Sequence, residues 1–296
     1  KNFLKDLNIK NNLEWHKLFT SKNKKMYLTH VISGIEDNKK YLTEYFLKVF
    51  PQRLKLFRML TPVGSNEVPL YSHNSITGRL TITNGINYLT MKKELRNNLT
   101  SSLKDHTILE LDFKSCEPNF YMRAKDLIGE EVEDIYTHIS KEIGLDAGQE
   151  RVKLKRSILS ILYGANNSTV KRLSKMNTAQ IEKIKSMLNV KSFEAELKKE
   201  FNKNGFIKNY YGRPILSDAN IVNYWIQSSS VDYCCLSFLK FLQENQDAKL
   251  HAVIHDAILF SVPNNKIQVY MNIKSLNCPI SNISIPIKIN INGLDN

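Results

Sequence analysis

The chain has 296 residues, 42% of them hydrophobic, which excludes a wholly disordered protein and favours two or three subdomains around a shared core. Its 42 Lys and Arg against 29 Asp and Glu give a formal net charge of +13. Such an excess favours a polyanionic partner such as nucleic acid, although a basic surface can also serve solubility alone. No apolar run approaches the ~18 residues of a membrane span and no signal peptide opens the chain, so an intracellular, cytoplasmic location without a membrane partner is expected.

The first third of the chain reads as helix followed by short strands. From Tyr41 to Leu60 apolar residues recur at nearly 3.6-residue spacing, and Pro51 should begin a new helix or kink this one. From Pro62 to Asn87 frequent Pro, Gly, Ser, Asn and Thr predict short strands and turns. Ile108 to Phe113 is then a β-prone run that contains a carboxylate near its end.

The remainder alternates between helix and strand. A helix-rich block is expected from Asp134 to Phe201 and a further helix from Val222 to Gln243. Strands are expected from Ala252 to Val262 and from Ile283 to Ile291, and Pro286 marks the last of them as an edge strand. Two carboxylate-bearing strands therefore flank a long helical insertion, which is an α+β organisation.

Asp112 and Asp256 are the first candidates for chemistry, because each is embedded in an apolar, strand-forming run. A carboxylate in such a run is costly to bury unless it is paired or binds a metal. Two of them on adjacent strands would suit two Mg²⁺ ions ~3.5–4 Å apart, since substrate phosphates supply the other ligands. For either residue alone, a position in a turn or at a cap is the more ordinary interpretation.

A second candidate is the segment from Arg151 to Gly164. At helical spacing Arg151, Lys155, Leu159 and Tyr163 lie on one gradually drifting face. Two cations followed by an apolar platform and an aromatic ring suit a nucleoside triphosphate with its base beyond. Taken alone, the segment is more ordinarily interpreted as an amphipathic helix with a solvated basic side.

Six segments, taken in order over residues 71–291, resemble the motifs of family A DNA polymerases, the bacterial DNA polymerase I type. They are Thr77 to Leu80, similar to the TGR segment; Asp112 to Glu117, similar to DYSQIE of motif A; Arg151 to Gly164, similar to RxxxKxxxFGxxYG of motif B; Asn223 to Asp232, similar to NxxIQGSAAD; Val253 to Asp256, similar to the start of VHDE in motif C; and Ile285 to Lys288, similar to the closing PLxV strand.

The resemblance implies roles for the residues nearest the chemistry. Asp112 and Asp256 would coordinate two Mg²⁺ ions, for which Mn²⁺ can substitute, with the Phe113 carbonyl as a further ligand. Arg151 and Lys155 would grip the incoming triphosphate, and Lys155 would donate a proton to the departing pyrophosphate.

Further residues would select the nucleotide. Tyr163 would stack or act as a hinge beside the nascent base pair. The Glu117 carboxylate would occupy the space of a 2′-hydroxyl, which implies dNTPs as substrates. Two positions depart from the family: Leu159 replaces an aromatic residue, and Ala257 replaces the Glu of motif C.

The remaining implied roles concern primer–template DNA. Arg79 and Gln227 would read the minor groove at the primer terminus, where acceptor atoms are nearly common to all base pairs. Asn223 and His255 would belong to the same DNA track. Other replication proteins, or further domains of a longer chain, are the additional partners expected.

The fold implied is a right-hand polymerase, with an antiparallel-sheet palm, helical fingers and a reduced helical thumb. The expected division is a thumb-like helical region at 1–70, palm at 71–133, fingers at 134–215 and palm again at 216–296. Residues ahead of Thr77 are too few for a 3′–5′ exonuclease domain, an economy that fits a phage, plasmid or mobile-element enzyme.

Template-directed addition of dNTPs to a primer 3′-hydroxyl is therefore the expected activity, and two alternatives stay open. The first keeps the fold and changes the substrate: a single-subunit RNA polymerase or primase-like enzyme. The second is a catalytically silent protein that only binds primer–template.

Overall fold

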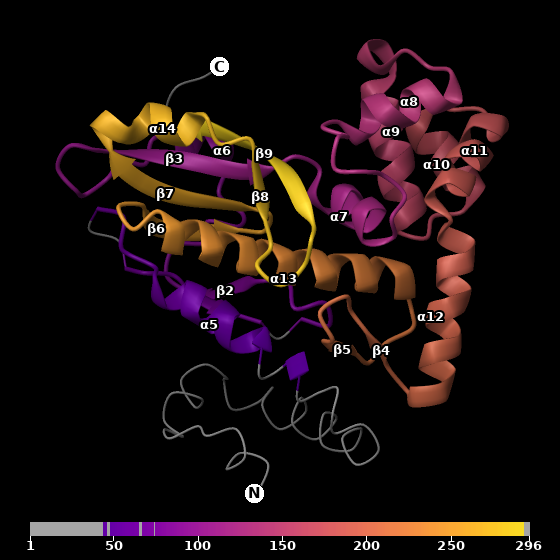
Figure 1. The fold of residues 1–296 in the computed structure, drawn as a ribbon, viewed down its shortest axis with the longest axis horizontal. Helices are drawn as coiled ribbons and strands as arrows, with labels where there is room; N and C mark the ends of the chain where they lie inside the picture. The colour runs from indigo at the N-terminus through magenta and orange to yellow at the C-terminus, as the bar shows by residue number, and fades with distance from the viewer. Residues whose placement is uncertain (1–43, 46–47, 65–66, 74, 293–296) are drawn as a thin grey trace, which may run out of the picture.

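The structure is a computed structural model that describes residues 44–45, 48–64, 67–73 and 75–292. A five-stranded antiparallel sheet lies at its centre (Figure 1). The strand order is β6 (Lys249–Ile254), β7 (Ala257–Pro263), β3 (His106–Phe113), β9 (Ser284–Ile291) and β8 (Ser275–Asn277). Two small ribbons pair β1 (Leu70–Ser72) with β2 (Thr81–Asn84) and β4 (Ile207–Lys208) with β5 (Pro214–Ile215).

Ten α-helices accompany these strands in the described part of the chain, and none of them is long and apolar enough to cross a membrane. They are α5 (Phe50–Arg58), α6 (Lys93–Asn97), α7 (Cys116–Ala124), α8 (Ile135–Ile143), α9 (Ala147–Leu162), α10 (Asn167–Ser174), α11 (Thr178–Leu188), α12 (Val190–Asn204), α13 (Ile221–Glu244) and α14 (Ile267–Met271). Helices α8 to α11 gather to one side of the sheet, and α12 leads back from them (Figure 1).

Strand β3 sorts its side chains between the two faces of the sheet, because successive residues of a strand point to opposite sides. Leu109, Leu111 and Phe113 are buried in the main core, whereas Asp112 alternates to the other face and is only partly buried. The Phe113 ring stacks on Phe238 of α13 with 5.2 Å between centroids. Helix α13 lies beneath the sheet and also packs against α5, α7 and α12 (Figure 1).

Several predicted elements are confirmed. Strand β3 covers the predicted β-run, α13 begins and ends within one residue of its predicted bounds, and helices fill the predicted block from 134 to 201. Pro51 lies in the first turn of α5, where its missing N–H costs nothing. Most of the predicted thumb-like region lies outside the described residues.

One predicted strand is in fact a hairpin. The run from Ala252 to Val262 divides into β6 and β7 around a two-residue turn, with Ile254 paired to Ala257. The residue that starts this turn, His255, has a positive φ of 54°, a conformation that short hairpin connections require. Asp256 therefore lies in the turn, beside the end of β3.

The edge position expected for the last strand is wrong, because β9 lies between β3 and β8. The carbonyl of Pro286 accepts a hydrogen bond from the Lys114 N–H at 2.9 Å, just beyond the end of β3. In an antiparallel strand the N–H and C=O of one residue point to the same side. The donor that proline lacks is thus missing where β3 has already ended, so the sheet loses little.

A buried ion pair joins α5 to α13. The Nη1 atom of Arg53 lies 2.5 Å from Oδ1 of Asp232, and neither side chain is exposed to solvent. Asp232 also accepts hydrogen bonds from the Tyr45 hydroxyl at 3.0 Å and the Asn209 amide at 2.7 Å. Breaking such a pair leaves an uncompensated buried charge, so the contact fixes the spacing of the two helices.

Gly78 offers a direct test of packing around the turn that precedes β2. Its φ is +71°, and a Cβ there would lie 1.5 Å from Nη1 of the buried Arg213. We expect Gly78→Ala to lower the free energy of unfolding by about 2–4 kcal/mol, from backbone strain and overpacking together.

Gly144 is the matched control, since its φ is also +71° but no atom lies within 4 Å of an added Cβ. Gly144→Ala should cost only about 1 kcal/mol. Urea unfolding of both variants measures the difference, and equal losses would contradict the close approach of Arg213.

Candidate active site

Asp112 and Asp256 meet at one end of the central sheet. Asp112 is paired across the sheet with Ala257, and the Phe113 N–H donates to the Asp256 carbonyl at 3.1 Å. Burial, followed by the neighbouring charge of Asp256, raises the pKa of Asp112 to about 7. Burial likewise raises the pKa of Asp256. The two carboxylates expected to act together are therefore adjacent, partly buried and mutually repulsive.

Cations oppose this repulsion. Lys155 of α9 lowers the pKa of both Asp112 and Asp256, which places its ammonium group within electrostatic reach of the pair. On the same face of β3, Glu110 forms an ion pair with Arg96, with 3.4 Å between Oε2 of Glu110 and Nη2 of Arg96. Strand alternation puts Glu110 and Asp112 side by side, and the Arg96 pair limits the negative charge that accumulates there.

Glu117, Arg79 and Tyr163 form one polar cluster next to the carboxylates. The Glu117 carboxylate accepts a hydrogen bond from Arg79 at 3.2 Å through Oε1 and another from the Tyr163 hydroxyl through Oε2. Arg79 precedes β2, Glu117 lies in the first turn of α7, and Tyr163 follows the last residue of α9. Glu117 thus contacts two other residues that the sequence had singled out separately.

A small pocket brings Arg79 and Glu117 of this cluster together with Asp256. Its lining comprises Arg79, Cys116, Glu117, Ser230, Val231, Cys234, His255 and Asp256. Burial, and then the charge of Arg79, lowers the pKa of His255, so the imidazole is neutral at physiological pH. The Sγ atoms of Cys116 and Cys234 lie 3.3 Å apart in this wall, and all four cysteines of the chain are free thiols.

Arg151 contacts Asp134 and Tyr136 and is not among the groups that shift the pKa of the carboxylate pair. It forms an ion pair with Asp134, the N-cap of α8, and its guanidinium carbon lies 4.9 Å from the centroid of the Tyr136 ring. Leu159, further along α9, is partly buried. Arg151, Lys155, Leu159 and Tyr163 do lie along one helix, but only Lys155 and Tyr163 interact with the carboxylates or with Glu117.

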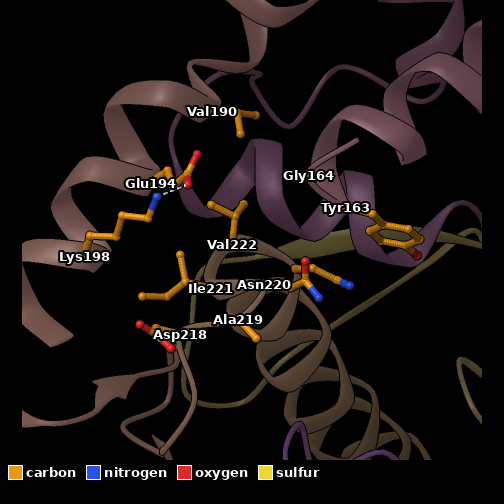
Figure 2. A pocket seen from close by; sticks show the side chains of 11 residues that line it. Tyr163, Gly164, Val190, Glu194, Lys198, Asp218, Ala219, Asn220, Ile221 and Val222 are labelled. Carbon is orange, nitrogen blue, oxygen red and sulfur yellow. Dashed lines mark ion pairs between the residues drawn. The ribbon is translucent and has the colours of Figure 1, made fainter. Parts of the chain in front are cut away.

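Asn223 and Gln227 lie one turn apart on α13. Asn223 lines a different cavity, of about 170 Å³, where the start of α13 faces Glu194 and Lys198 of α12 (Figure 2). Figure 2 shows the Tyr163 ring turned away from the other side chains of this cavity, in keeping with its bond to Glu117. The described contacts do not bring Asn223 or Gln227 to Arg79.

Sequence reasoning assigned no role to the buried residues behind the cluster, chiefly Arg53, His73 and Arg213. One signal was available: Asp232 interrupts the otherwise uncharged sequence from Ile221 to Leu239 in α13, and a buried carboxylate requires a cation. The identity of that cation is not readable from the sequence, since Arg53 lies 179 residues earlier.

The donor set at the carboxylate pair fits a hard divalent cation. No group of three or more His, Cys, Asp or Glu side chains in the described residues is arranged to hold a metal. Two adjacent, partly buried carboxylates, of which Asp256 raises the pKa of Asp112, nevertheless gain from a cation between them, and Mg²⁺ needs few protein ligands when phosphates provide the rest.

No protein-family model and no curated protein matches the sequence. Among solved structures, the polymerase domain of Pol1 from M. smegmatis in complex with DNA primer-template and dNTP matches with a TM-score of 0.57 and 13% sequence identity. The match covers 76% of this chain and 47% of that chain, so this chain spans about half the length of that structure. The similarity establishes a mixed α/β fold, with an antiparallel sheet, like that of a polymerase domain.

The raised pKa of Asp112 predicts a dependence of stability on pH. Its ordinary value is near 3.8 and its value in the fold is about 7, so folding disfavours the ionised form. In metal-free buffer the contribution of Asp112 to stability should therefore fall as pH rises from about 4 to about 7, and stay low above that.

Asp112→Asn removes this titration, so its Tm should exceed that of the wild type increasingly as pH rises over the same range. Thermal unfolding with a chelator present measures the difference. Glu142→Gln, at an exposed position of α8, is the control and should track the wild type. A wild-type and Asp112→Asn difference that is constant with pH would contradict the assignment.

Proposed function

We propose that this chain is a template-directed DNA polymerase that adds dNTPs to the 3′-hydroxyl of a primer. The observation that carries the proposal is the meeting of Asp112, at the end of β3, with Asp256 in the β6–β7 turn. Around them lie Lys155, the Arg79–Glu117 pair and Tyr163. The fold similarity to a polymerase domain supports the same conclusion.

Asp112 and Asp256, with the Phe113 carbonyl, are the residues that would hold two Mg²⁺ ions, and Mn²⁺ would serve in their place. When bound, such ions lower the pKa of an attacking hydroxyl and stabilise the charge on a leaving pyrophosphate. Without a bound cation, burial favours the protonated form of both carboxylates. Lys155 favours the ionised form by lowering the pKa of each.

Arg151 and Lys155 are proposed to bind the triphosphate. Lys155 lies within electrostatic reach of the carboxylates and would donate a proton to pyrophosphate as it leaves, which offsets the charge that develops there. The Arg151 side chain is about half exposed, with a relative accessibility of 50%, so a triphosphate would compete with Asp134 for its guanidinium. Leu159 would support the base with a flat apolar surface.

Glu117 is proposed to exclude ribonucleotides by occupying the space of the 2′-hydroxyl. Its two hydrogen bonds, from Arg79 and Tyr163, fix both carboxylate oxygens and so limit its ability to move aside.

The primer–template is proposed to be contacted by Arg79, Gln227, Asn223 and His255. In this proposal residues 71–133 and 216–296 form the palm, 134–215 the fingers and 1–70 a thumb-like region. Other replication proteins are proposed as further partners.

Asp256→Asn tests the catalytic assignment. We expect it to lower the rate of primer extension in Mg²⁺ by about a thousandfold or more, because a metal-binding carboxylate is lost. Affinity for the duplex should change little, since phosphate contacts from Lys and Arg dominate it. Gel-based extension and fluorescence anisotropy measure the two effects, with Glu142→Gln as control. Full extension activity in Asp256→Asn would reject the proposal, and duplex binding by an inactive wild type would favour a silent binding protein.

Glu117→Ala tests the choice of sugar. We expect the ratio of kcat/KM for dNTP over rNTP to fall by about tenfold or more once the space beside the 2′-carbon is open. Glu117→Gln keeps the volume of the side chain and should retain most of the preference. Single-nucleotide extension with both nucleotide classes provides the ratio. A wild type that prefers rNTPs would instead identify an RNA polymerase or primase-like enzyme.

A further inference from the structure

Arg53 reaches from α5 to the turn that carries Arg79. Its Nη1 atom donates to Asp232 at 2.5 Å, while its Nη2 atom donates to the carbonyl of Gly78 at 3.0 Å and contacts Nδ1 of His73 at 2.9 Å. A guanidinium group only donates, so His73 must accept through Nδ1 and carry its proton on Nε2. The whole arrangement is buried, with Arg53 fully inaccessible to solvent.

The turn contains two hydrogen bonds of its own. The Gly78 N–H donates to the Ser75 carbonyl at 2.9 Å, and the Ser75 hydroxyl donates to the Arg79 carbonyl at 3.0 Å. These two bonds shape the turn internally. The Arg53 guanidinium ties this turn to helix α5, by a hydrogen bond to the carbonyl of Gly78, the residue immediately before Arg79.

Arg213 also packs against this turn. Its guanidinium occupies the space where a Cβ of Gly78 would stand, and its Nη2 donates to the His73 carbonyl at 3.3 Å. His73 and Gly78 therefore each contact two buried arginines, Arg53 and Arg213. These contacts fix the backbone next to Arg79, and the Arg79 side chain extends from there to Glu117.

We propose that Arg53 is a positioning residue, which fixes Arg79 through the Gly78 carbonyl and so holds the Glu117 carboxylate in place for the choice of sugar. This inference rests on the proposed function. It adds a connected path of contacts from helix α13 to the proposed nucleotide site. The path runs from Asp232 through Arg53 and Gly78 to Arg79 and Glu117.

Arg53→Lys separates positioning from simple charge neutralisation. A lysine keeps one positive charge for Asp232, but its single ammonium group cannot also reproduce the fork that reaches Gly78 and His73. We expect the dNTP over rNTP ratio to fall by about tenfold, the scale of one lost charge-assisted hydrogen bond. Arg79→Ala should lower the ratio similarly, and the double variant should fall no further than Arg79→Ala alone.

Arg123 provides a matched control. It is also a buried arginine that donates to two backbone carbonyls, those of Gly129 at 2.9 Å and Val132 at 2.5 Å. Arg123→Lys should lower Tm as Arg53→Lys does but leave the nucleotide ratio unchanged. An unchanged ratio in Arg53→Lys, or effects of Arg53→Lys and Arg79→Ala that simply add, would overturn the inference.

Hydrogen–deuterium exchange gives a readout that needs no activity. Exchange of the Gly78 amide should accelerate in Arg53→Lys and not in Arg123→Lys, because only the first variant frees the turn. An inactive wild type would defeat the proposed function while leaving this measurement intact. If Arg53→Lys does not fold, the charge-balanced pair Arg53→Gln with Asp232→Asn makes the same test, and unaltered Gly78 exchange in it would overturn the positioning role.

Discussion

The register between β3 and β7 is the constraint on which the site depends. Asp112 pairs with Ala257, and the bond from the Phe113 N–H to the Asp256 carbonyl extends that pairing into the turn. A slip of one residue would turn Asp112 toward α13 and Phe113 away from it, because side chains alternate along a strand. The aromatic contacts of Phe113 with Phe238 and Tyr233 oppose such a slip. Packing on one face of the sheet thereby locates the carboxylates on the other.

The sequence was most informative where a residue type conflicts with its surroundings. Asp112 and Asp256 stand out as carboxylates in apolar runs. The motif-like segments around them, which occur in the order of the polymerase family, indicated a mixed α/β fold like the one observed. The turn at His255 was missed because the residues on both sides are equally apolar, so a hairpin and a continuous strand give the same pattern. Pro286 was misread because an edge is a property of the whole sheet, which depends on where the short β8 lies.

Contacts between distant segments were beyond prediction. Glu117 and Tyr163 are 46 residues apart, and Arg53 and Asp232 are 179 apart. Neither pair follows from helical or strand periodicity, since the first depends on the packing of α7 against α9 and the second on that of α5 against α13. The ion pair of Arg151 with Asp134 was missed for a related reason. Its partner is a helix cap, and a cap residue is expected to bond to backbone N–H groups first.

The central position of β3 has a consequence for how the chain folds. Its two neighbours, β7 and β9, begin at residues 257 and 284, so the middle of the sheet cannot be complete until residues 284–291 have left the ribosome. Helices α8 to α12 are contiguous in sequence and can form earlier from local contacts. During synthesis the helical unit would thus form before the cleft. Strand β3 would meanwhile be unpaired and largely apolar, and such segments are prone to aggregation.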